Sequence, residues 1–170
     1  VLVDPLDGTK EFVSRRGGEF TVNIGEIVDG KAIAGVVYAP ALERLFAGET
    51  GHGAFEQDAR GTRAIAARTP ATDGLVAVSS KSHPDAKTGA LLESLPIKGH
   101  THAGSSLKFC LLAAGEADIY PRAGRTMEWD TAAGHAVLAS AGGRVTDWDG
   151  KPFTYGKPGF QNGAFIARGR

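Results

Sequence analysis

The chain opens on Val1-Leu2-Val3-Asp4-Pro5-Leu6-Asp7-Gly8-Thr9, where an apolar strand is expected to break into a tight turn with two carboxylates three residues apart. Its proline has no amide hydrogen to give to a sheet, so the oxygens around it can turn outward. Asp4, Asp7 and the carbonyl oxygen of Leu6 form a ligand set that suits a hard cation such as Mg²⁺. Amides at the glycine and threonine that end the motif suit a phosphate oxygen. The motif predicts a metal and phosphate site, although similar residues also form ordinary turns.

A second acidic motif lies far downstream, in Met127-Glu128-Trp129-Asp130-Thr131-Ala132-Ala133-Gly134. The alanine-rich run that follows predicts a helix, so Asp130 is expected at or near its N-terminus. Aspartate is a good helix N-cap, which is the simpler role. A third metal carboxylate is the alternative.

Composition excludes several classes of protein. Of 170 residues, 42% are hydrophobic, which fits a soluble globular protein. Lys plus Arg equals Asp plus Glu at 19 each, so the chain has no charge excess for a nucleic-acid polymer or an anionic membrane. Cys110 is the only cysteine, which excludes an internal disulfide and fits a reducing, cytoplasmic compartment. No stretch approaches the length of a transmembrane segment.

The pattern of strands and helices changes near residue 70. Before it, alternation and turn residues predict a β-hairpin of strands 20–28 and 31–38, further strands 42–47, 53–57 and 63–67, and one short helix after Thr9. After it, we expect strands 75–79, 97–102, 118–120, 144–147 and 164–167, with a turn at Asn162-Gly163 and helices 84–94, 105–115 and 129–141. The sequence therefore predicts an α/β (α+β) fold, with an antiparallel half at 1–70 and an α/β half at 71–170.

Together, the two acidic motifs resemble the signatures of the inositol monophosphatase superfamily, which are Mg²⁺-dependent, lithium-sensitive phosphatases. Within it, the flanking residues are most similar to bacterial 3′(2′),5′-bisphosphate nucleotidases of the CysQ type. The stretches that carry this similarity are Lys10-Glu11-Phe12, Gly18-Glu19-Phe20-Thr21-Val22-Asn23-Ile24, Ser80-Lys81-Ser82-His83, Gly104-Ser105-Ser106-Leu107-Lys108-Phe109-Cys110 and Asp118-Ile119-Tyr120-Pro121-Arg122. The resemblance implies a layered α/β/α/β/α sandwich, N-terminally incomplete here, because family members carry a sizeable region before the first motif.

The resemblance also implies the catalytic roles. Asp4, Asp7 and Asp130 would bind two or more Mg²⁺ ions together with the Leu6 carbonyl oxygen. Three crowded carboxylates repel one another unless a cation occupies their centre, so metal binding explains the cluster physically. Thr9 would orient the attacking water with an acidic residue from the N-terminal region. A metal-binding Glu is also expected there, so residues 1–170 alone are expected to be inactive.

Substrate contacts are expected mainly from the second half. The resemblance implies a binding set of Gly8, Thr9, His83, Ser105, Ser106, Lys108, Arg122 and Asp130. Lys108 and Arg122 decide the class of substrate, because a second phosphate needs a second cationic contact. A solvated lysine and a loop histidine are the simpler roles for Lys108 and His83.

We therefore expect a Mg²⁺-dependent phosphatase that removes the 3′-phosphate of the small nucleotide 3′-phosphoadenosine 5′-phosphate, and possibly of its 5′-phosphosulfate relative, with metal-activated water. An inositol or sugar monophosphatase is the alternative within the same class. A non-catalytic nucleotide- or metal-binding fragment is the alternative of another class. The sequence leaves the oligomeric state open.

Overall fold

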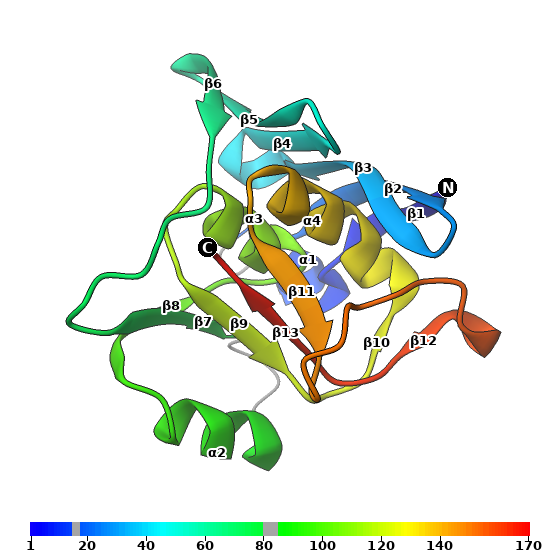
Figure 1. Cartoon of the computed structure of the whole chain (residues 1–170). Helices are drawn as coiled ribbons and strands as arrows, with labels where there is room; N and C mark the ends of the chain where they lie inside the picture. The colour runs from blue at the N-terminus through cyan, green and yellow to red at the C-terminus, as the bar shows by residue number, and fades with distance from the viewer. Residues whose placement is uncertain (15–17, 80–84) are drawn as a thin grey trace.

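The computed structural model describes residues 1–14, 18–79 and 85–170, and its larger sheet is formed by the first part of the chain (Figure 1). This sheet is antiparallel and six-stranded, in the order β1-β2-β3-β4-β5-β6. Its strands are β1 (Leu2–Asp7), β2 (Thr21–Val28), β3 (Lys31–Ala39), β4 (Arg44–Glu49), β5 (Gly53–Asp58) and β6 (Gly61–Ile65). The short helix α1 (Thr9–Ser14) follows β1. The expected antiparallel half is therefore confirmed.

Turn residues set the boundaries of these strands. Asp29 and Gly30 both have positive φ angles, of 48° and 73°, which suits the tight turn that joins β2 and β3 into the expected hairpin. β4 begins two residues later than expected because the 3₁₀ turn η1 (Pro40–Leu42) comes first. Proline fixes its own φ and has no amide hydrogen, so it favours the start of this turn over a strand.

The second sheet is mixed and five-stranded, in the order β11-β13-β9-β7-β8. β9 and β8 both run parallel to β7, and the pairs β11–β13 and β13–β9 are antiparallel. The strands are β7 (Leu75–Ser79), β8 (Ile97–His102), β9 (Ile119–Arg122), β11 (Arg144–Asp147) and β13 (Phe165–Arg168), and the helices are α2 (Ala86–Glu93), α3 (Leu107–Ala113) and α4 (Glu128–Ser140). This confirms the alternation expected after residue 70.

The structure has two short strands that were not predicted from the sequence. β10 (Thr126–Met127) pairs with β12 (Gln161–Asn162), just after the 3₁₀ turn η2 (Pro158–Phe160). The expected turn at Asn162-Gly163 is therefore wrong in part, because Asn162 lies in a strand. Its amide nitrogen donates to the carbonyl oxygen of Met127 at 2.7 Å, and this tertiary contact is invisible to a local pattern.

The elements stack in layers (Figure 1). Helices α3 and α4 lie between the two sheets, and α2 lies on the far side of the five-stranded sheet. Leu91 and Leu92 of α2 pack there against Ala77 and Ile119. This order of sheet, helices, sheet and helix is the layered α+β arrangement that was expected. No helix among the described residues is long and apolar enough to cross a membrane.

The main core lies between the two sheets. Phe46 of the six-stranded sheet and Phe109, Leu138 and Phe165 of the second half are at most 1% exposed and belong to one hydrophobic cluster. The boundary between the sheets falls between β6 and β7, close to the expected division at residue 70. The division of the chain into an antiparallel half at 1–70 and an α/β half at 71–170 stays a prediction.

Candidate active site

The first acidic motif forms a β-bulge instead of the expected tight turn. β1 continues to Asp7, but its register against β2 shifts: Asp4 lies opposite Asn23 and Asp7 lies opposite Thr21. Between these two pairs, β1 therefore advances by three residues and β2 by only two. Side chains three apart in a regular strand point to opposite faces, and one extra residue returns them to the same face. The bulge therefore brings both carboxylates to one side of the sheet.

Asp130 reaches the same place from α4. A row of glycines on neighbouring strands, Gly25, Gly35 and Gly48, lies under this helix, each opposite the next in register. A Cβ atom added to Gly25 would lie 2.8 Å from the Cβ of Ala132, closer than packed atoms approach. The glycine row therefore lets α4 lie directly on the sheet, with its first turn beside the bulge.

Asp130 also closes the first turn of its helix. Its Oδ2 accepts a hydrogen bond of 2.7 Å from the backbone N–H of Met127, the residue before α4. The N-cap role proposed from the sequence is thus replaced by a contact made from the third helical position.

These three side chains, which we call the acidic triad, come together in the fold. Asp4, Asp7 and Asp130 each offer a carboxylate oxygen, and these oxygens lie within 4.8 Å of one another. Burial above all, together with the charges of Asp130 and Asp4, raises the pKa of Asp7 to about 6, against the opposing effects of Lys108 and the Ser106 amide. Burial, with the charge of Asp4, also raises the pKa of Asp130. The triad therefore brings three carboxylates together in a partly buried place, which suits a divalent cation.

The rest of the first motif surrounds the triad. Within the bulge, neither Pro5 nor Leu6 is paired with a residue of β2. The carbonyl oxygen of Leu6 accepts from the chain that follows. The hydroxyl of Thr9 is exposed and donates to that oxygen at 3.4 Å. Gly8 has a φ of 86°, which glycine adopts without strain as the chain turns into α1.

The serines expected to hold substrate have partners within the protein. The Gly104 amide donates to Oε2 of Glu19, and the Ser105 hydroxyl donates to the carbonyl oxygen of Glu19. The Ser106 amide donates to Oδ2 of Asp7 at 2.7 Å. Ser106 is only 1% exposed. The amides of Gly104 and Ser106 are therefore engaged within the protein, and a substrate role for Ser105 and Ser106 stays a prediction.

Lys108 is buried beneath the same loop. Its ammonium group donates to the carbonyl oxygen of Ser105 at 2.6 Å and lies 5.2 Å from the ring centre of Tyr120. It is near enough to lower the pKa of Asp7. A solvated lysine, the simpler alternative, is therefore wrong, and its positive charge faces the site from within the protein.

Arg122 ends β9 next to the second motif. Its charge lowers the pKa of Asp130, which places the guanidinium group in the electrostatic field of the triad. Its Nε is buried and has no hydrogen-bond partner in the described part of the chain. Such a donor suits an anionic ligand. His83, also expected at the site, lies outside the described residues.

Thr21 and Asn23 lie beside the site, although they were not predicted as site residues. Both are almost completely buried, and the Asn23 amide donates to Oδ2 of Asp7 at 3.3 Å. They had been noted only as part of the stretch that carries the family resemblance. Alternation along β2 could have placed both on one face, but only the bulge in β1 puts that face opposite Asp7.

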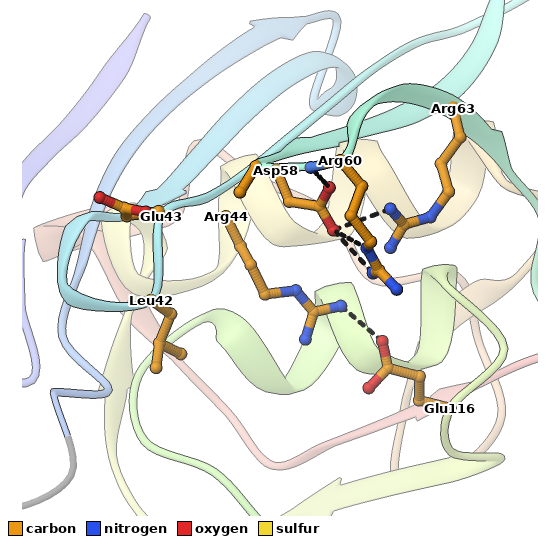
Figure 2. A pocket seen from close by; sticks show the side chains of 8 residues that line it. Leu42, Glu43, Arg44, Asp58, Arg60, Arg63 and Glu116 are labelled. Carbon is orange, nitrogen blue, oxygen red and sulfur yellow. Dashed lines mark hydrogen bonds and ion pairs between the residues drawn. The ribbon is translucent and has the colours of Figure 1, made fainter.

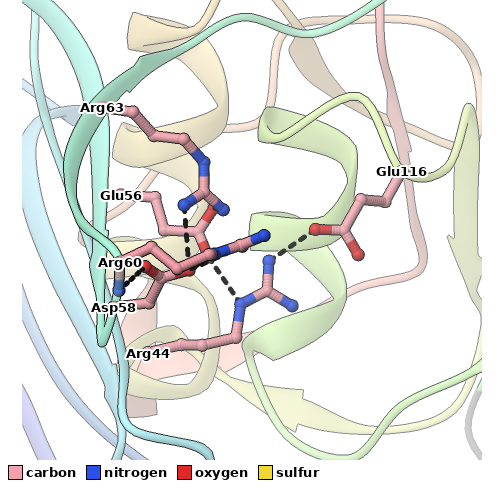
Figure 3. A network of polar contacts seen from close by, with 6 residues as sticks. All are labelled: Arg44, Glu56, Asp58, Arg60, Arg63 and Glu116. Atoms are coloured by element: carbon pink, nitrogen blue, oxygen red, sulfur yellow. Dashed lines mark hydrogen bonds and ion pairs between the residues drawn. The ribbon is translucent and has the colours of Figure 1, made fainter.

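A second charged cluster lies away from the triad, and we call it the arginine cluster (Figure 3). It consists of Arg44, Glu56, Asp58, Arg60, Arg63 and Glu116. Glu56 is fully buried and is bound by Arg44 and Arg63, both at 2.6 Å. Most of these side chains line an open depression of about 410 Å³ (Figure 2). Because its guanidinium groups are paired with carboxylates, we assign this depression no ligand.

The amino-acid sequence matches a known protein family and several named relatives. The model of the inositol monophosphatase family matches residues 1–168. The 3′(2′),5′-bisphosphate nucleotidase CysQ of Shigella flexneri is 51% identical over 154 residues, which cover 91% of this chain and 61% of that relative. Its counterpart in Buchnera aphidicola is 43% identical over 98% of this chain and 63% of that relative. The chain thus spans somewhat less than two thirds of these curated relatives.

Solved structures show the same fold. CysQ from Bacteroides thetaiotaomicron, described as a bacterial member of the inositol monophosphatase family, has a TM-score of 0.89 and 36% identity, and the match covers 98% of this chain and 68% of that one. Inositol monophosphatase from Anabaena has a TM-score of 0.79 and 30% identity, over 98% of this chain and 65% of that one. This chain belongs to the inositol monophosphatase family. Among its relatives, it is highly similar to bacterial 3′(2′),5′-bisphosphate nucleotidases.

Proposed function

We propose that this chain is the metal- and substrate-binding part of a Mg²⁺-dependent phosphatase that hydrolyses the 3′-phosphate of 3′-phosphoadenosine 5′-phosphate, and of its 5′-phosphosulfate relative, to leave a 5′-nucleotide. The acidic triad is the observation that carries the proposal, because three carboxylates within 4.8 Å of one another are a strong site for a hard cation. The choice of substrate draws on the relatives that are 43% to 51% identical and bear the nucleotidase name.

Asp4, Asp7 and Asp130, with the Leu6 carbonyl oxygen, would hold two or more Mg²⁺ ions. Bound there, Mg²⁺ supplies a Lewis acid for the phosphoryl oxygens and for the attacking water. The chain's part is to fix the carboxylates, through the bulge in β1 and the packing of α4 on the sheet. Thr9 is exposed beside the motif, and its hydroxyl can orient water.

The two phosphates of the substrate have different partners in this proposal. The reacting phosphate lies at the acidic triad, close to the Gly8 and Thr9 backbone. The second phosphate is bound by Arg122, whose buried Nε has no protein partner among the described residues. Lys108 adds positive charge from beneath the loop, and Ser105, Ser106 and His83 complete the proposed binding set.

The competing activity within the family is that of an inositol or sugar monophosphatase, and the structural match to the Anabaena enzyme favours it as the second candidate. The test compares phosphate release from 3′-phosphoadenosine 5′-phosphate and from inositol 1-phosphate by the complete protein with Mg²⁺, because residues 1–170 alone are expected to be inactive. We expect kcat/KM to be much higher for the nucleotide. Equal or reversed values would overturn the nucleotidase assignment.

Variants of the cationic residues separate substrate recognition from chemistry. Arg122→Ala and Lys108→Ala should weaken the bisphosphate far more than a small phosphate monoester, since the lost charge contacts a group that does not react. An equal loss on both substrates would assign the residue to the reacting phosphate or to folding. If the complete protein binds Mg²⁺ and nucleotide but releases no phosphate, the non-catalytic alternative is correct.

A further inference from the structure

A buried chain of hydrogen bonds connects the acidic triad to helix α3. The Ser106 hydroxyl donates to Oδ1 of Asn23 at 2.6 Å and lies 2.9 Å from the Thr21 hydroxyl. The Asn23 amide nitrogen then donates to Oδ2 of Asp7. Thr21, Asn23 and Ser106 are each at most 1% exposed. Polar groups so deeply buried are costly to keep unless each has a partner, and here each has one.

The direction of the donors along this chain is fixed. A serine hydroxyl has one hydrogen, and that of Ser106 points to Asn23. The hydrogen between the two hydroxyls must therefore come from Thr21. Asn23 accepts through its oxygen, so its N–H group is directed to Asp7. Successive donors of this kind polarise one another, which strengthens the last bond to the carboxylate.

Both donors to Asp7 reach the same carboxylate oxygen. The Ser106 backbone N–H and the Asn23 side chain both bind Oδ2, at 2.7 and 3.3 Å. Within the described residues, Oδ1 accepts no hydrogen bond. Both hydrogen bonds therefore hold Oδ2 of Asp7, and Oδ1 is left for a ligand. A rotation about the Cβ–Cγ bond would break both hydrogen bonds at once.

We infer that Asn23 and Ser106 are positioning residues of the metal site, which hold Asp7 so that one of its oxygens faces the cation. The inference rests on the proposed function, because it takes Asp7 as a metal ligand. It also explains why Ser106, expected to bind substrate, is turned inward. Because Asn23 lies in β2 and Ser106 begins the turn into α3, the pair fixes the position of α3 relative to the first acidic motif.

The test measures Mg²⁺ affinity by calorimetry, together with the Mg²⁺ concentration that gives half-maximal phosphate release. Asn23→Ala should weaken Mg²⁺ binding about 10- to 100-fold, as is usual for partners of metal ligands, with a smaller change of kcat at saturating Mg²⁺. Ser106→Ala keeps the backbone bond to Asp7 and should lose less. Ser106→Thr restores the hydroxyl and should recover affinity.

Glu56→Gln is the matched control, since Glu56 is also fully buried and hydrogen-bonded but lies in the arginine cluster. It should lower thermal stability and leave Mg²⁺ affinity unchanged. The inference is overturned if folded Asn23→Ala and Ser106→Ala bind Mg²⁺ as the wild type does, or if Glu56→Gln weakens binding equally. Asp7→Asn distinguishes a failure of the positioning role from a failure of the proposed metal site. If this variant leaves Mg²⁺ affinity unchanged, the metal site itself is wrong.

Discussion

Two clusters of three carboxylates in this protein have opposite electrostatic environments. In the arginine cluster, Arg60 and Arg63 hold the pKa of Asp58 well below its usual range. In the acidic triad, burial and neighbouring carboxylates raise the pKa of Asp7 to about 6. None of the ion pairs formed among residues 1–14, 18–79 and 85–170 involves the triad.

The difference separates structural charges from functional ones. The carboxylates of the arginine cluster are compensated by the protein's own side chains, so they stabilise the fold without any ligand. Lys108 lowers the pKa of Asp7, but burial, and then the charges of Asp130 and Asp4, leave that pKa raised. Buried carboxylates that repel one another destabilise the fold, and a bound ligand of opposite charge offsets that cost. A divalent cation is the ligand that the carboxylate oxygens of the triad suit.

The largest expected effect comes from removing charge from the triad. Asp7→Asn and Asp130→Asn keep the shape of the side chain and should each lower kcat at least about 100-fold, since even loss of a ligand's outer partner costs 10- to 100-fold. Phosphate release at limiting Mg²⁺ measures this. The metal-free variants should unfold at a temperature equal to or above that of the wild type, because a repulsion is removed. Wild-type activity in either variant would remove that residue from the metal site.

The same kind of change in the arginine cluster should act on stability alone. Arg44→Met leaves the buried Glu56 with only Arg63 as a partner and should lower the free energy of unfolding by about 3 kcal/mol. Urea denaturation measures the change. Arg60→Ala is the control: this side chain is 78% exposed, and its loss should cost less than about 1 kcal/mol. Similar losses in both variants would contradict the structural role of Glu56.

The two clusters should also respond to pH with opposite signs. The folded-state pKa of Asp7 is raised from 3.8 to about 6, so the folded state binds more protons than the unfolded state in that window. The stability of the metal-free protein should therefore fall as pH rises from about 4 to 6, by about 2 to 3 kcal/mol from this group. Asp58 has a lowered pKa, so its contribution is present above pH 3.8 and is lost as pH falls further.

Asp7→Asn isolates the first of these contributions. The difference in unfolding free energy between wild type and variant should grow between pH 4 and 6 without metal, and saturating Mg²⁺ should abolish the loss in the wild type. A wild-type curve that runs parallel to that of the variant over this range would show that the Asp7 carboxyl is not destabilised in the fold.

Local patterns predicted most of the fold. Alternation along β2 and β3 with Asp29-Gly30 between them predicted a hairpin, and the change of pattern near residue 70 predicted the second sheet. The predictions of strand boundaries and of short strand pairs failed where tertiary contacts determine the structure. β10 and β12 have only two residues each, too few to show an alternating pattern. The buried Asn162 donates hydrogen bonds to Met127 and Thr131, and such contacts between distant residues leave no periodic pattern in the sequence.

The sequence predicted which acidic residues would come together, but it did not predict how the strands arrange them. Two spaced aspartates and a helix-initiating Asp130 indicated a metal site from sequence alone. The bulge that brings Asp4 and Asp7 to one face could not be predicted, because it depends on the register with β2. For the same reason Asn23 was missed and Ser106 was expected to face the substrate.

The most direct test of the metal site is a Mg²⁺ titration of thermal stability at pH 7. If the triad binds Mg²⁺, the unfolding temperature of the wild type should rise with Mg²⁺ concentration as expected for a ligand of the folded state. The rise should be absent in Asp130→Asn and intact in Arg60→Ala. No rise in the wild type, or the same rise in Asp130→Asn, would contradict the assignment of Asp4, Asp7 and Asp130 as a divalent cation site.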